Sequence, residues 1–177
     1  MFPGKYQAVH AAALTVVLLA LAASGVQAFI FSDPGSLYTA AIPDSWIYQA
    51  YHSTDQLAVF YGEGDWDLLY FEGLGKVADQ SVRELAERSL ALYGEPGGLS
   101  GFQLETPLLP VEVGGLQGLA CAYTYQDERG NLLWEYRIFL LLPDGEGFSI
   151  ALGSNGPWVK NNPPVLEEVL KKWQWTD

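Results

Sequence analysis

Residues 116–142 read LQGLACAYTYQDERGNLLWEYRIFLLL, and this stretch decides the fold. Apolar residues alternate with others on both sides of a polar segment at 127–131, which predicts two long antiparallel strands joined by a hairpin loop. Every second residue of the second strand, from Leu132 to Leu142, is expected to face the core, while Glu135 and Arg137 point to solvent. The apolar residues of the first strand share one face: Leu119, Cys121, Tyr123 and Tyr125.

Shorter strands are expected on either side of this hairpin. Residues 29–35 look like a lead-in, and residues 102–113, broken by Pro107 and Pro110, look like an irregular edge segment. A turn is expected at 62–65, and Asp144-Gly145 predicts a tight turn. The expected strands cover residues 37–42, 46–51, 56–61, 67–72 and 147–153.

Two segments change to the three- and four-residue period of an amphipathic helix. The first follows Ser81, which with Glu84 forms a capping box, and it ends at Gly94 and Pro96. Its expected apolar face consists of Val82, Leu85, Ala86, Ser89, Leu92 and Tyr93. The second follows Asn162 as cap and Pro163 as first residue. Its expected apolar face consists of Val165, Leu166, Val169, Leu170 and Trp173. We therefore expect an α+β fold, in which two amphipathic helices pack on an antiparallel sheet.

The N-terminus has the pattern of a secretory signal peptide. Lys5 precedes an uncharged apolar run at 11–23, and Val26-Gln27-Ala28 follows as a small-x-small cleavage site. The run is too short for a bilayer span, so we expect cleavage after Ala28 and no stable membrane insertion afterwards. Residues 1–28 are thus predicted to be a signal peptide and residues 29–177 a single exported domain, periplasmic or extracellular.

Charge and cysteine content narrow the function classes. The formal net charge is −12, which disfavours nucleic acid and anionic lipid surfaces as partners. Cys121 is the single cysteine, so an internal disulfide is excluded. Its place in an apolar strand predicts a small buried hydrophobic residue rather than a reactive thiol.

Candidate chemistry is sparse, and we predict no catalytic residue, metal site or cofactor. After residue 28 only His52 and Cys121 are zinc-type ligands, fewer than a zinc site needs. Glu63, Asp65 and Asp67 could bind Ca²⁺ loosely, but they do not match an EF-hand loop, and a solvated acidic hairpin is the preferred interpretation. A hydrolase would have to use His52 or a pair of carboxylates, since no Gly-x-Ser-x-Gly motif is present.

Tryptophan offers the best candidates for contact with a partner. Trp66, Trp158 and Trp175 fall in a turn, a loop and the tail, where an exposed indole can anchor a protein contact. The expected contact surface consists of Glu63, Asp65, Trp66, Asp67 and Trp158.

The chain resembles the PsbP-like family, which includes the PsbP subunit of photosystem II and the exported DcrB-like proteins. Three features carry the resemblance over most of residues 37–175. They are the stretch Tyr38 to Trp46 (YTAAIPDSW), the central helix, and the long strand pair followed by a strand and a C-terminal helix with Trp173. The resemblance implies the fold and an accessory role in larger assemblies, and it transfers no functional residue.

Three functions follow from these observations. The first is an exported, non-catalytic binding domain that acts on a protein partner or a cell-envelope complex. The second is a small-ligand or Ca²⁺-binding module that uses the hairpin at 62–67 or a pocket between sheet and helix. The third is a hydrolase of unknown substrate.

Overall fold

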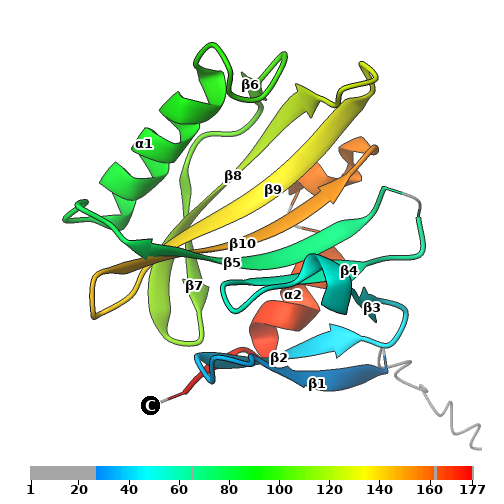
Figure 1. Ribbon diagram of the computed structural model, residues 1–177, viewed down its shortest axis with the longest axis vertical. Coiled ribbons are helices and arrows are strands. Elements are labelled where there is room, and N and C mark those ends of the chain that lie inside the picture. Colours follow the sequence, from blue (N-terminus) through cyan, green and yellow to red (C-terminus); the bar gives the residue numbers. More distant parts are fainter. Residues whose placement is uncertain (1–26, 65, 162, 177) are drawn as a thin grey trace, which may run out of the picture.

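Two antiparallel β-sheets and two α-helices make up the computed structural model, which describes residues 27–64, 66–161 and 163–176 (Figure 1). The large sheet has the order β3-β4-β5-β10-β9-β8-β6, and β7 also pairs with β8. Its strands are β3 (Ile47–Tyr48), β4 (Leu57–Tyr61), β5 (Leu68–Lys76), β6 (Gln103–Leu104), β7 (Leu109–Val113), β8 (Leu116–Gln126), β9 (Leu132–Leu141) and β10 (Glu146–Ser154). The small sheet has the order β1-β2-β11, formed by β1 (Ala28–Ser32), β2 (Tyr38–Pro43) and β11 (Gln174–Trp175). The α+β prediction is confirmed.

The long hairpin forms as predicted. β8 and β9 pair from Gln126 opposite Leu132 to Gly118 opposite Leu140. The Asp127 carboxylate accepts hydrogen bonds from the backbone N–H groups of Arg129 and Asn131, each at 2.8 Å. Gly130 supplies the left-handed residue of the loop, with φ of 79°. These local interactions fix the register of the sheet's longest strand pair.

One face of the large sheet packs against the small sheet and α2 (Pro164–Lys171), which Figure 1 shows on the same side. Tyr38 of β2 stacks on Trp173 with ring centroids 4.4 Å apart, and Phe71 of β5 meets the same indole edge-on at 5.0 Å. Leu166 and Val169 of α2 join this main core. Pro163 immediately precedes the helix, and Asn162, the expected cap, lies outside the described residues.

The opposite face is partly covered by α1 (Val82–Gly94). As predicted, the Ser81 side chain caps this helix by accepting from the Glu84 N–H at 3.2 Å. Ala86 packs in a second core with Cys121, Tyr123 and Phe139. The prediction for Leu92 is wrong, because this side chain is exposed while Tyr93 turns toward the sheet.

Two further predictions are corrected. Glu135 and Arg137 do not face solvent: they are 3% and 6% exposed, because α1 and its flanking loops cover the face to which they belong. The expected lead-in at 29–35 contains β1, which pairs along its length with β2 and buries Phe31 against Phe60 at 5.0 Å. Across the described ranges, no helix is both long and apolar enough to cross a bilayer.

Cys121 offers a direct test of how firmly α1 is held. Its thiol is buried, and burial, reinforced by Glu135 and opposed by Arg137, raises its pKa from 9.0 to about 12. We expect a disulfide reagent to leave folded Cys121 unmodified at pH 8 and to label it rapidly in denaturant. As the pH rises, the thiol ionises in the unfolded chain before it ionises in the folded protein. Burial of the neutral thiol therefore contributes fully to stability below pH 9, and this contribution is lost as the pH rises toward 12.

Ser81→Ala, which removes the cap of α1, tests whether opening of this helix exposes the thiol. A cap of this kind contributes about 1 kcal/mol, so native labelling should quicken by about fivefold if opening of α1 exposes the thiol. Immediate labelling of the unmodified protein would contradict the burial of Cys121.

Candidate functional site

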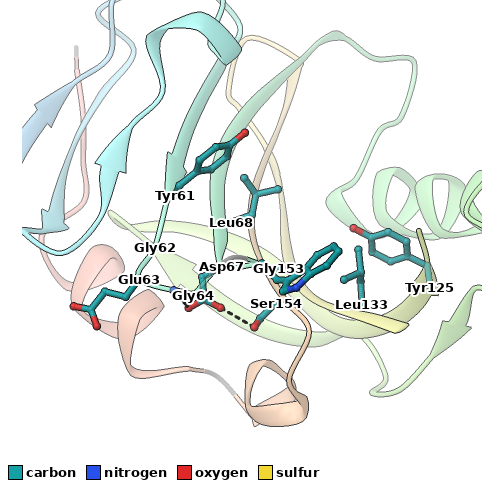
Figure 2. A pocket seen from close by; sticks show the side chains of 11 residues that line it. Tyr61, Gly62, Glu63, Gly64, Asp67, Leu68, Tyr125, Leu133, Gly153 and Ser154 are labelled. Atoms are coloured by element: carbon teal, nitrogen blue, oxygen red, sulfur yellow. Dashed lines mark hydrogen bonds between the residues drawn. The ribbon is translucent and has the colours of Figure 1, made fainter. Parts of the chain in front are cut away.

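The half of the sheet face that α1 leaves uncovered contains a cleft of about 450 Å³. Its walls come from five strands, β4, β5, β8, β9 and β10, and Figure 2 shows Tyr61 and Tyr125 on different sides of it with Leu68 and Leu133 between them. We call this site the aromatic cleft. It is lined by Tyr61, Gly62, Glu63, Gly64, Trp66, Asp67, Leu68, Tyr125, Leu133, Gly153 and Ser154.

The turn between β4 and β5 builds one wall of the aromatic cleft. Gly62 N–H donates to the Asp67 carbonyl at 2.9 Å, and Asp67 N–H donates to the Gly64 carbonyl at 3.0 Å. A Cβ on Gly62 would lie 2.7 Å from the Asp67 Cβ, so this close approach requires glycine. The Asp67 carboxylate accepts from Gly64 N–H at 3.2 Å and from the Ser154 hydroxyl at 2.7 Å (Figure 2). The turn is therefore tied to the end of β10.

Large aromatic side chains at the cleft remain open to solvent. Tyr61 is 41% exposed and Trp66 is 37% exposed. Ile47, directly opposite Tyr61 in the β3–β4 pairing, is also exposed and extends the apolar surface to the edge of the sheet. Exposed aromatic and aliphatic groups that meet at a hollow are typical of a binding surface.

The charge at the cleft is negative. Glu63 and Asp67 are its charged lining residues, and neither forms an ion pair within the described ranges. Burial, together with the charges of Glu135 and Asp127, raises the pKa of Tyr125 to about 12 despite Arg137. Tyr125 therefore stays neutral at physiological pH beside a cleft that carries two negative side chains.

A buried polar network lies beside the cleft and under α1, and the sequence analysis missed it. Arg137 Nε donates to Glu135 Oε1 at 2.9 Å, and its Nη1 donates to the Tyr93 hydroxyl of α1 at 2.9 Å and to Glu72 at 3.3 Å. The Tyr70 hydroxyl donates to the other Glu135 oxygen at 2.9 Å. Tyr123 also donates to Glu135.

In this network Arg137 forms ion pairs with two carboxylates, and each polar side chain is hydrogen-bonded to another. Burial, followed by the charge of Glu135, raises the pKa of both Tyr70 and Tyr123, which keeps these hydroxyls protonated as donors. Arg137 in turn donates to the Tyr70 hydroxyl. Because each member is engaged by another, we interpret this network as the structural link between the sheet and α1 rather than as a reactive site.

The structure brings some of the predicted contact residues together and separates others. Glu63, Trp66 and Asp67 line the aromatic cleft, and Asp65 lies outside the described residues. Trp158 does not line it: this residue belongs to η2 (Pro157–Asn161), whose Lys160 lies over Trp134 on the opposite face of the sheet.

The other candidates have different surroundings. His52 lies in η1 (Ala50–His52) beside the Tyr61 ring at 5.7 Å, with no carboxylate at ion-pair distance in the described part of the chain. Trp175 donates to the Val113 carbonyl and packs on the main core. In the residues that the structure describes, no three His, Cys, Asp or Glu side chains converge as a metal site would require.

Comparison with known proteins identifies the fold. No protein-family model matches the sequence, and no curated protein is similar to it in sequence. Among solved structures, PsbP (CyanoP) of Synechocystis is similar with a TM-score of 0.59 at 12% identity, over 87% of this chain and 95% of that one. LpqN, involved in cell envelope biogenesis of Mycobacterium tuberculosis, is similar with a TM-score of 0.50 at 14% identity, over 85% and 91%.

A Bacteroides thetaiotaomicron protein is also similar, with a TM-score of 0.57 at 14% identity over 84% of this chain. The match spans 48% of that protein, about half of its length. At these identities the likeness concerns the fold alone. The chain has a PsbP-like fold, as the resemblance at Tyr38–Trp46 and in the later elements implied.

Proposed function

We propose that this PsbP-like fold serves as an exported, non-catalytic binding domain whose aromatic cleft holds a protein partner of the cell envelope. The observation that carries the proposal is the uncovered half of the sheet, where Ile47, Tyr61 and Trp66 are exposed around one hollow. Burial of such side chains is the main source of affinity in protein interfaces.

Two further observations support the proposal. The signal-peptide pattern of residues 1–28 directs the chain out of the cytoplasm, and cleavage after Ala28 would leave Phe29 as the first residue, within β1. LpqN, which shares the fold, is involved in cell envelope biogenesis. An accessory role at the envelope is compatible with both.

Site-specific photocrosslinking in the native host tests this function. With a photoreactive residue at Ile47, we expect a reproducible envelope protein to be crosslinked, and the crosslink to be lost when Trp66→Ala is added. The same residue at Leu104, an exposed apolar position on β6 at the other end of the sheet, is the matched control and should capture nothing comparable.

Trp158→Ala is the second control, because Trp158 is 43% exposed but does not line the aromatic cleft. This variant should keep the crosslink. The purified protein should also have the mass of a chain that begins at Phe29. Equal crosslinking from positions 47 and 104, or a crosslink indifferent to Trp66, would rule out the cleft as the docking site.

A further inference from the structure

We infer that the aromatic cleft recognises a positively charged side chain, arginine or lysine, on an extended segment of the partner protein. This inference rests on the proposed function and specifies the chemistry of the ligand. It depends on three features of the cleft: the sign of its charge, the state of its aromatic rings and its position at the edge of the sheet.

The charge of the cleft matches a cation. Glu63 and Asp67 are negative, and among the described residues no Lys, Arg or His lines the hollow. The donors that hold Asp67 in place, Gly64 N–H and the Ser154 hydroxyl, are neutral, so its charge is not cancelled. Most basic groups of the described chain are engaged elsewhere: Lys76, Arg88, Arg137 and Lys160 all pair with other carboxylates.

The aromatic rings are available to receive that cation. Among the described residues, Trp66 has no aromatic ring partner, and the one aromatic partner of Tyr61 is the exposed His52. Tyr125 lies with its ring centroid 6.3 Å from that of Tyr123 and also lines the hollow. A guanidinium or ammonium group gains attraction from the face of a Trp or Tyr, and this attraction grows when the group is desolvated.

The surroundings of the cleft favour a chain segment as its occupant. Ile47 and Tyr61 continue the apolar surface from the cleft to the edge strand β3, so an extended segment can lie along it while one side chain enters the hollow. A second copy is disfavoured because each chain carries a formal charge of −12. An extended basic segment complements both the local and the overall charge.

The test is a peptide titration followed by NMR on isotopically labelled protein, expressed from its full coding sequence and purified as the cell processes it. The probe is a blocked peptide of Gly and Ser with one central Arg, and the matched peptide carries neutral citrulline at that position. We expect saturable shifts of the Trp66 indole N–H and the Gly64 amide with the Arg peptide. The citrulline peptide should bind about fivefold or more weakly, and added salt should weaken the Arg peptide.

Variants separate the contributions. Trp66→Ala and Glu63→Gln should each weaken the Arg peptide by about threefold or more, while Trp158→Ala and Glu95→Gln, a matched Trp and a matched exposed acid elsewhere, should leave it unchanged. Equal binding of the Arg and citrulline peptides would overturn the inference. Binding of choline with no response to the Arg peptide would also overturn it, in favour of a small organic cation.

The two proposals can fail separately. If position 47 crosslinks a partner in a Trp66-dependent way, but the crosslinked segment carries no Arg or Lys and the Arg peptide does not bind, the binding function stands and the cation inference falls. If position 47 crosslinks nothing, the proposed function itself falls, whatever the peptide does.

Discussion

Replacing Arg137 with Met is expected to lower the free energy of unfolding by about 3–5 kcal/mol. The substitution keeps a long side chain in place but removes the positive charge beside Glu135, which is 3% exposed. A buried carboxylate that has lost its cation keeps the cost of desolvation but loses the attraction that offset this cost. The same change frees the Tyr93 hydroxyl of α1, which accepts from Arg137 at 2.9 Å, so the loss extends to the docking of the helix. Urea unfolding followed by circular dichroism measures the effect.

A double-mutant cycle identifies the cause. Glu135→Gln alone should be milder than Arg137→Met, because Arg137 retains Glu72 as a partner at 3.3 Å. The double variant should be less destabilised than the sum of the two single ones, since it leaves no isolated buried charge. A loss below about 1 kcal/mol for Arg137→Met would show that the network contributes little beyond packing.

The local parts of the fold follow from the sequence. The hairpin at 116–142 combines two apolar segments of period-two pattern with a polar loop, and Ser81 with Glu84 marks the start of α1. Both signals depend on neighbours a few residues apart. Such short-range signals need no knowledge of the rest of the chain. They were sufficient for the fold class and for the PsbP-like resemblance.

To predict the burial of Glu135 and Arg137, the register of the hairpin had to be considered as well as the alternation. Alternation shows which residues share a face but not whether that face is covered. The hairpin register places Tyr123 opposite Glu135 and Cys121 opposite Arg137, so the charges share a face with apolar residues. Apolar residues on both faces of a strand pair indicate that both faces are covered. This pattern in the sequence could have predicted that an element such as α1 covers Arg137.

The aromatic cleft was predictable only in part. Glu63, Trp66 and Asp67 stand out as an exposed turn, but Tyr125 and Leu133 come from strands more than fifty residues further on. They meet the turn because β10 pairs with both β5 and β9. Pairing between strands so distant in sequence leaves no local pattern. The contribution of Tyr125 and Leu133 to the cleft could therefore not be predicted before the strand order was known.

Replacing Trp173 with Ala is expected to cost about 3–5 kcal/mol of unfolding free energy. The indole is 3% exposed and lies where α2, β2 and β5 meet, stacked on Tyr38 and edge-on to Phe71. Truncation would leave a cavity there and release the chain that links α2 to β11. Urea unfolding should show the loss, with Trp158→Ala, a partly exposed indole, changing stability by about 0.5 kcal/mol or less.

Trp173→Phe separates the packing of the ring from the cost of its unpaired N–H group. Within the described residues, the Trp173 Nε1–H is buried without a hydrogen-bond partner, a state that costs about 1–3 kcal/mol. Phenylalanine removes this group and keeps a ring against Tyr38, so the variant should lose far less stability than Trp173→Ala. If both variants were equally destabilised, the cost would come from the bulk of the indole alone. If Trp173→Phe loses less stability than Trp173→Ala, as we expect, packing of an aromatic ring between the two sheets and α2 is the main contribution of this residue. This packing would then outweigh the cost of the unpaired donor.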